Sequence, residues 1–323
     1  MSGGWNTIES DAGVFTSLLS TLGIPDVQCE ELISLDSDTL STLSPLGVIF
    51  LFRYPTGDSS QLSGQRDGQL DHSASDPDAN GNSPVWFARQ SIQNACGTQA
   101  LLSVVLNKSV TEGVQLGSTL GEFRDFTAGF DSELRGDALS NSTAIRDAHN
   151  SFARASPFIS DEQKLATEDD DVFHFIGYTA VGGKLYELDG LQGAPISHGE
   201  CKAEEFAQKV IPVLQRRIER YPAHEIRFNL LAVCKDLRIR ARELGDSEWL
   251  YREEEKRRAW RWENALRKHN FVGFIGELAK GVVKQKVEKG EYDRWVEEAK
   301  GRTRSRREEA RKKGRGGDEM DIE

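Results

Sequence analysis

Apolar and polar residues follow patterns that predict an ordered α/β start over residues 5–56. Helical spacing links four side chains near the N-terminus: Val14, Leu18, Leu19 and Leu22. The apolar run 48–52 is typical of a buried strand. Residues 57–83 are rich in Ser, Gly, Asp, Gln and Asn and hold few apolar anchors. We therefore expect a long, exposed and flexible loop there.

The central part of the chain predicts helices followed by a polar connection. Asn94 is a candidate N-cap for an apolar helix that continues through Leu106. Further helices are expected at about 119–130 and 139–155. Residues 156–171 are polar and acidic. Connections of this length are uncommon inside a domain and are often lids.

A hairpin is predicted next. Two strand-like stretches, 172–181 and 184–188, flank Gly182-Gly183. Glycines adopt the positive φ angles that a two-residue turn requires, so the pattern indicates paired antiparallel strands. A helix and a closing strand are expected after it, at about 203–220 and 227–233.

The C-terminal part is helical in pattern and highly charged from about 236 to 269. An amphipathic helix follows, with apolar residues at helical spacing: Phe271, Phe274, Ile275, Leu278 and Val282. This stripe has two interpretations. It docks on the preceding domain as part of a core, or it binds in a groove of another protein. From about 300 the chain is basic and low in complexity.

Charge is unevenly distributed over the 323 residues, whose net charge is −11. Residues 300–315 hold nine Lys or Arg and two Glu, a net of +7, and the last eight residues hold four acids. Residues 1–299 therefore carry −14. An acidic body favours a basic macromolecular partner through electrostatic steering, and it argues against nucleic acid as the substrate of the main domain.

Length and cysteine usage narrow the class of protein. The length suggests about two domains and allows a substantial core. The four cysteines, at positions 29, 96, 201 and 234, are widely spaced and form no CxxC pair, which argues against a zinc site and a disulfide framework. A reducing compartment, cytosol or nucleus, fits this usage. No apolar run approaches the ~18 residues of a membrane span, and no signal peptide is expected.

Cys96 stands near the start of the predicted apolar helix. The helix dipole and free backbone N–H groups there favour a thiolate, which is a nucleophile. Gln90, six residues earlier, can direct its side-chain amide at a developing oxyanion. Each residue alone has a simpler interpretation: a small buried cysteine, and an exposed polar residue at a strand end.

The hairpin supplies a base and an orienting carboxylate. With Gly182-Gly183 as the turn, His174 faces Leu191, and Asp189 lies diagonally from His174 on the same face. Asp189 can then hold the imidazole in the tautomer that presents its other nitrogen to a thiol. Alternatively, His174 is a packed core histidine and Asp189 a turn residue. The other histidines and cysteines are interpreted as structural.

Gln, Cys, His and Asp in this order follow the logic of papain-like hydrolases. The segment Gln90-Ser-Ile-Gln-Asn-Ala-Cys96-Gly-Thr-Gln-Ala resembles the active-site motif of the ubiquitin carboxyl-terminal hydrolases. Phe173-His-Phe, followed by Leu185-Tyr-Glu-Leu-Asp189-Gly-Leu, resembles the family's His/Asp motif. Two further segments are similar to the family, 5–15 and 139–154.

This resemblance implies an α/β (α+β) fold class: a papain-like, knotted catalytic domain with a central sheet flanked by helices. It implies roles by position, with Cys96 as nucleophile, His174 as general base and proton donor, Asp189 as the orienting carboxylate and Gln90 as oxyanion donor. No metal or cofactor is implied. A crossover loop, here about 153–172, is expected to span the active site and limit the size of the leaving group.

The C-terminal part resembles the helical extension of the proteasome-associated subfamily. Three segments carry this similarity: Glu263-Asn264, 267–271 and Phe274-Ile275. The implied organisation is a catalytic domain, an all-α linker and partner-binding extension, and a charged tail, at 1–234, 235–299 and 300–323. The implied partners are ubiquitin, ubiquitin conjugates and a proteasomal ubiquitin receptor, in the cytoplasm and nucleus.

The leading hypothesis is thus a thiol-dependent deubiquitinase in proteasome-linked protein catabolism. The alternative is a non-catalytic ubiquitin-binding scaffold of the regulatory particle, which would require a missing or misplaced member of the Cys-His-Asp set. A third hypothesis gives the basic tail a nucleic-acid role. Glu308 and Glu309, mixed among the tail's basic residues, favour a solvated charged helix and a protein partner instead.

Overall fold

The computed structural model describes residues 4–54, 67–77, 83–92, 94–153, 173–222 and 225–315. They divide into two compact units. The first contains the described residues up to Lys268, and the second those from His269 onward.

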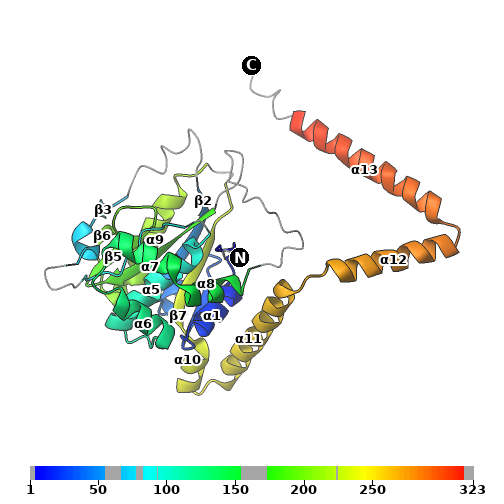
Figure 1. The fold of residues 1–323 in the computed structure, drawn as a ribbon. Coiled ribbons are helices and arrows are strands. Elements are labelled where there is room, and N and C mark those ends of the chain that lie inside the picture. The colour runs from blue at the N-terminus through cyan, green and yellow to red at the C-terminus, as the bar shows by residue number, and fades with distance from the viewer. Residues whose placement is uncertain are drawn as a thin grey trace. The chain divides into compact units, whose positions relative to one another are not determined.

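An antiparallel sheet forms the centre of the first unit (Figure 1). Among the described residues it has seven strands, in the spatial order β1 (Val27–Glu31), β7 (Asn229–Lys235), β2 (Gly47–Arg53), β4 (Phe173–Val181), β5 (Lys184–Leu188), β6 (Ile196–Glu200) and β3 (Gln69–Leu70). Every neighbouring pair is antiparallel. The central strands β2 and β4 come from distant parts of the sequence.

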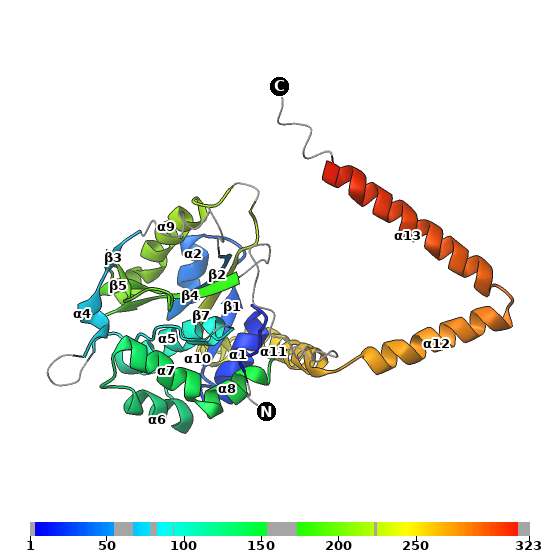
Figure 2. The same ribbon diagram turned by 45° about the horizontal axis from the view of Figure 1, so that its top comes forward.

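Helices cover both faces of this sheet, as Figure 2 shows. One face carries α1 (Ala12–Thr21), α5 (Cys96–Thr111), α6 (Ser118–Phe126), α7 (Ser132–Asn141) and α8 (Thr143–Asn150). The other carries α2 (Ser37–Thr42) and α9 (Phe206–Ile218), which follows the short 3-10 helix η2 (Ala203–Glu205). The predicted central sheet flanked by helices is confirmed.

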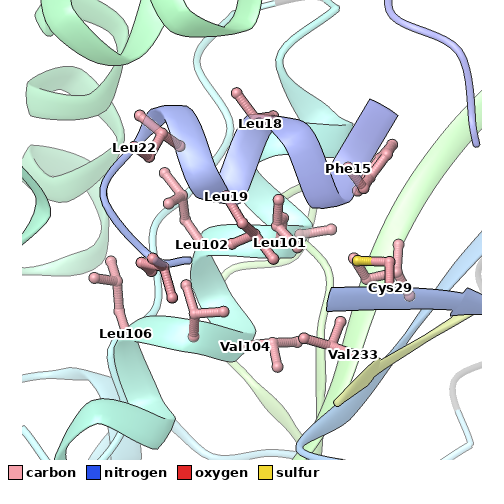
Figure 3. Close-up of a cluster of buried hydrophobic side chains, with 14 of the residues drawn as sticks. Phe15, Leu18, Leu19, Leu22, Cys29, Leu101, Leu102, Val104, Leu106 and Val233 are labelled. Carbon is pink, nitrogen blue, oxygen red and sulfur yellow. The ribbon is translucent and has the colours of Figure 1, made fainter. Parts of the chain in front are cut away.

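Alternation along the strands explains the two cores. In β2, Phe50 and Phe52 belong to the cluster under α9, whereas Ile49 packs in the cluster under α1 and α5. Successive strand residues point to opposite faces, so a strand covered on both faces becomes apolar throughout. Figure 3 shows the cluster under α1 and α5, where Phe15 and Leu19 of α1 pack in one core with the side chains of α5. Burial of such side chains stabilises the fold by roughly 1.5–3 kcal/mol each.

The predicted hairpin between β4 and β5 is confirmed. Gly182 and Gly183 have φ angles of 56° and 80°. The ladder runs from Val181 opposite Lys184 to Gly177 opposite Leu188. Both turn residues therefore lie in the left-handed region, which glycine adopts without steric cost.

The predicted flexible loop at 57–83 is wrong for residues 67–77. This segment forms β3 and the short helix α4 (His72–Ser75). Asp71 accepts hydrogen bonds from Lys184 Nζ at 3.1 Å and Tyr186 Oη at 3.0 Å, and Arg135 Nη1 donates to the Ser75 carbonyl at 3.1 Å. The polar composition thus serves specific contacts with the sheet and α7. Residues 57–66 and 78–82 lie outside the described part of the chain, as do 154–172 of the predicted crossover loop.

The first unit extends beyond the predicted domain boundary at 234. Helices α10 (Leu237–Glu243) and α11 (Ser247–Lys268) belong to it. Asn264 Nδ2 donates to the Gly13 carbonyl at 3.1 Å, and Arg267 donates to Asp11 Oδ2 at 2.9 Å. The charged composition of α11 hid this contact, because the helix docks largely through polar side chains.

The second unit consists of α12 (Val272–Glu288) and α13 (Tyr292–Arg315). None of the side chains of α12 is buried. The apolar stripe predicted from spacing is exposed, with Phe274 at 67%, Ile275 at 59% and Leu278 at 58%. No helix in the described part of the chain is long and apolar enough to cross a membrane.

Candidate active site

Cys96 is the first residue of α5 and is half-buried. The N-cap is Ala95, which makes no side-chain capping bond. An alanine has no side-chain oxygen that could accept a hydrogen bond from the free N–H groups of the first turn, so these groups can bind an anion instead. The dipole at this helix end also favours a negative charge. The thiol therefore stands where a thiolate is stabilised.

Asn94 is not the N-cap, contrary to the prediction. Its φ of 67° lies in the left-handed region, which asparagine tolerates better than most residues. Its side-chain Nδ2 donates to the Trp5 carbonyl at 3.2 Å. The residue therefore turns the chain into α5 and ties this turn to the N-terminal segment.

His174 lies near the start of β4 and is only 4% exposed. Its Nε2 donates to Asp189 Oδ1 at 2.7 Å. The edges of the rings of Phe52 and Tyr54 meet the imidazole at centroid distances of 5.7 and 5.8 Å. The ring is thus fixed by one hydrogen bond and two aromatic contacts, which leaves Nδ1 for the Cys96 thiol.

Asp189 follows directly after β5 and is 2% exposed. Its Oδ1 also accepts from the Leu191 backbone N–H at 3.0 Å. The predicted diagonal contact with His174 is present. The predicted facing of His174 and Leu191 is wrong, because the β4–β5 ladder ends at Gly177 and Leu188 and the chain turns after Asp189. His174 instead pairs with Phe52 of β2.

Burial and two neighbouring groups determine the charge state of His174. Burial alone would lower its pKa, but the hydrogen bond with Asp189 and the contact with the Cys96 thiol raise the pKa to about 9. Burial would raise the pKa of Asp189, but the hydrogen bond from His174 holds this pKa below its usual range. The arrangement therefore favours an imidazolium between a carboxylate and a sulfur.

Gln90 lies in the segment before α5 and is joined to the turn that carries Asp189. Its backbone N–H donates to the Gly190 carbonyl at 2.8 Å, and its side-chain Nε2 donates to the Ile92 carbonyl at 2.9 Å. Gly190 allows this approach, because a Cβ there would stand 2.3 Å from Gln99 Nε2 and 3.0 Å from the Gln90 Cβ. One amide hydrogen of Gln90 is engaged by Ile92, and the amide has a second.

Sequence reasoning missed a buried polar network beside this site. Glu187 is 2% exposed and contacts Tyr178, His198 and Arg217. Glu187 lies in β5, two residues before Asp189, so its place on the same face was predictable from strand alternation. No pattern in the sequence indicated Arg217, which reaches the site from α9.

The remaining cysteines are buried free thiols: Cys29, Cys201 and Cys234. Burial raises the pKa of each, so none resembles Cys96 in its surroundings. Within the described ranges no group of three or more His, Cys, Asp or Glu is arranged to hold a metal ion.

Comparison with known proteins agrees with this geometry. The profile described as "Ubiquitin carboxyl-terminal hydrolase, family 1" matches residues 5–219, which include the whole candidate site. The chain belongs to the ubiquitin carboxyl-terminal hydrolase family. Membership identifies it as a cysteine-type ubiquitinyl hydrolase. A second profile, "Ubiquitin carboxyl-terminal hydrolases", matches residues 248–287 of this hydrolase, from α11 through most of α12.

Individual relatives span most of the hydrolase. "Ubiquitin carboxyl-terminal hydrolase 2" of Schizosaccharomyces pombe is 47% identical over 310 residues, covering 94% of this chain and 99% of the relative. "Ubiquitin carboxyl-terminal hydrolase isozyme L5" of Dictyostelium discoideum is 36% identical, covering 87% and 92%. A solved structure, the Trichinella spiralis UCH37 catalytic domain bound to ubiquitin vinyl methyl ester, is similar with a TM-score of 0.60 and 37% identity. It covers 73% of this chain and 97% of that domain.

Proposed function

We propose that this hydrolase cuts the bond after the C-terminal glycine of ubiquitin by Cys-His-Asp acyl transfer. The observation that carries the proposal is the pair of contacts on His174, with Asp189 on Nε2 and the Cys96 thiol at the other side of the ring. The alternative of a non-catalytic scaffold requires a missing or misplaced member of this set. The three residues are brought together here, which favours the enzyme.

Each residue has a defined part in the proposed reaction. The Cys96 thiolate attacks the glycine carbonyl carbon, and the carbonyl electrons move to oxygen. The oxyanion collapses, the bond to the leaving amine breaks, and the His174 imidazolium donates its proton to that amine. Neutral His174 then takes a proton from water, whose oxygen attacks the thioester and releases ubiquitin and the thiolate. Asp189 keeps the imidazole oriented throughout.

Gln90 and the start of α5 are the proposed oxyanion donors. The N–H groups of the first turn of α5 are uncapped, and the Gln90 amide retains a hydrogen beyond the one donated to Ile92. Donors that are already oriented stabilise developing charge without reorganisation, and removing one costs about 2.7–4 kcal/mol in the transition state.

The decisive experiment compares the wild-type chain with Cys96→Ala. The substrate is ubiquitin carrying a fluorophore at its C-terminus, and we expect fluorophore release to be abolished. An electrophilic ubiquitin probe should attach to wild type at Cys96 and form no adduct with the variant. Cys201→Ala, made in the otherwise wild-type chain, serves as the matched control and should keep both activities. Turnover retained by Cys96→Ala would refute the assignment, and probe binding without an adduct in wild type would support the scaffold.

We further propose that α12 binds a ubiquitin receptor of the proteasome regulatory particle, in the cytoplasm and nucleus. The support is its exposed apolar stripe, together with the second family profile that covers most of α12. Helices with such stripes bind in apolar grooves of their partners. The alternative is that the stripe docks on the first unit.

Two α12 variants separate these possibilities. Phe274→Asp and Leu278→Asp should abolish co-sedimentation with purified regulatory particles while fluorophore release by the isolated chain stays unchanged. Lys284→Asp, at a position that is 78% exposed on the same helix, is the control and should keep binding. A lower midpoint of unfolding in the two apolar variants, with binding intact, would instead support docking on the first unit.

A further inference from the structure

A second buried ion pair, between Glu187 and Arg217, lies beside the proposed catalytic residues. The reaction described above does not use it. Glu187 of β5 is buried, and its carboxylate receives a hydrogen bond from Arg217 Nη1 of α9. The Tyr178 hydroxyl donates to Glu187 Oε2 at 3.1 Å, and His198 Nε2 lies 3.2 Å from the same oxygen. A buried carboxylate is costly unless it is paired, and this one has three partners.

Arg217 links this pair to His174. Its guanidinium lies over the face of Phe52, 4.7 Å from the ring centroid. Phe52 in turn contacts the His174 imidazole edge-on, at a centroid distance of 5.7 Å. The planar guanidinium therefore supports the aromatic ring that confines the histidine, a contact that a lysine ammonium does not reproduce.

Arg217 also acts on Asp189 through its charge. Glu187 lies in β5 and Asp189 directly follows that strand, two residues later, so two buried carboxylates lie close together. The positive charge of Arg217 helps to keep the pKa of Asp189 low, after the larger effects of burial and the His174 hydrogen bond. The pKa of Arg217 is itself raised: burial opposes its charge, but Glu187, Tyr178 and Asp189 favour it.

We propose that Arg217, held in place by Glu187, is a positioning residue for the His174–Asp189 pair. It would fix the ring of Phe52 against the imidazole and balance the negative charges of Glu187 and Asp189. This inference rests on the catalytic assignment of Cys96, His174 and Asp189 made above.

Other titratable groups surround this pair and must be considered in any pH dependence. Six of them belong to strands and helix α5 or directly follow a strand: Tyr54, Cys96, His174, Tyr178, Asp189 and His198. Asp67 precedes β3, and the segment after α9 supplies Arg220, Tyr221 and Glu225. Of these, Tyr178 and His198 contact the Glu187 carboxylate directly.

The test is the pH dependence of kcat/KM with the ubiquitin–fluorophore substrate, together with the rate of Cys96 alkylation by iodoacetamide read by mass spectrometry. Loss of a positive charge disfavours the thiolate and favours the imidazolium. In Arg217→Gln we therefore expect both limbs of the profile to move to higher pH. A shift of about one unit lowers kcat/KM about tenfold on the acid side.

Three companion variants separate charge from packing. Glu187→Gln combined with Arg217→Gln removes one charge of each sign and should return both limbs toward the wild-type positions. Arg217→Lys should keep the limbs in place but lower the rate, because the planar contact with Phe52 is lost. Arg216→Gln is the control. Arg216 directly precedes Arg217 on α9, is half-exposed and donates a hydrogen bond to Asp67 instead of Glu187.

The outcomes are distinguishable. Unmoved limbs in Arg217→Gln, or a double variant whose limbs stay where those of the single variant lie, would overturn the proposal. If Arg217→Gln does not fold, the charge-balanced double variant and Arg217→Lys still test it, because unchanged rates and limbs in both would refute a positioning role. Failure of the catalytic assignment would appear separately, as activity retained by Cys96→Ala.

Discussion

His174 is the residue on which the geometry of the active site converges. Its Nε2 is held by Asp189, its ring edges are confined by Phe52 and Tyr54, and its remaining nitrogen serves the thiol. The carboxylate and the sulfur both stabilise the positive imidazolium, which is why the pKa of His174 lies at about 9 although the ring is buried. At neutral pH His174 is therefore mainly the imidazolium, which can serve as the proton donor of the proposed reaction.

Asp189→Asn tests this account through pH. The amide removes the negative charge that raises the pKa of His174, so the imidazolium loses its proton at lower pH. We expect the alkaline limb of the kcat/KM profile to move to lower pH, and kcat/KM at pH 7.5 to fall by about 10²-fold or more. Gln192→Ala is the control, because it keeps the Asp189 charge and removes only the 3.4 Å hydrogen bond from Gln192 Nε2 to the Asp189 carboxylate. An alkaline limb that does not move would contradict the assigned source of the raised pKa.

Some of the site was predictable at this scale and some was not. The contact between His174 and Asp189 was predicted from the glycine turn, which sets the hairpin register up to Gly177 and Leu188, although the ladder ends before both residues. The position of Asn94 did not, since its left-handed backbone depends on a partner, the Trp5 carbonyl, that is distant in sequence. Arg217 likewise reaches Glu187 across thirty positions of the chain, and no local pattern encodes that contact.

At the scale of elements, the active site is held at the junction of α5, β4 and the turn after β5. The segment before α5 is joined to that turn by the hydrogen bond between Gln90 and Gly190. The start of α5 and the turn that carries Asp189 are therefore tied to one another. Helix α1 packs in the same core cluster as α5, and its Phe15 contacts the ring of Phe175 in β4 at a centroid distance of 5.7 Å.

Helix α1 is in turn covered by α11, and a single glycine sets their separation. A Cβ at Gly13 would lie 2.6–2.8 Å from three atoms of Trp260. Gly13→Ala should therefore displace Trp260 and lower the free energy of unfolding by about 1–3 kcal/mol. The measurement is urea denaturation followed by far-UV circular dichroism.

Two variants control for this prediction. Trp260→Ala combined with Gly13→Ala should cost less than the sum of the two single changes, because the clash disappears with the indole. Gly121→Ala in α6, where an added Cβ meets nothing within 4 Å, should leave stability unchanged or raise it by up to about 1 kcal/mol. Equal losses at Gly13 and Gly121 would show that helix packing is not the cause.

For the whole molecule, the sequence predicted the fold class, but it predicted three parts with the first ending at residue 234, whereas the structure has two compact units. The central sheet and its covering helices followed from apolar periodicity. Helix α11 did not, because it docks through Glu253, Arg257 and Asn264, which are buried polar residues that a hydrophobic pattern does not reveal. The compact unit therefore ends at Lys268, after α11.

Truncation tests this division directly. A chain ending at residue 268 keeps α10 and α11. We therefore expect its midpoint of urea unfolding and its fluorophore release to match those of the full chain, while binding to the regulatory particle is lost with α12.

A chain ending at residue 234 removes two hydrogen bonds to Gln28 Oε1. One comes from Arg257 Nη2 at 3.0 Å, and the other comes from the Leu237 N–H. Gln28 is then left without these partners, and the apolar surface around Gly13 loses its cover. We expect the shorter chain to lose several kcal/mol of its free energy of unfolding. Equal unfolding midpoints for the two truncated chains would return the boundary to residue 234.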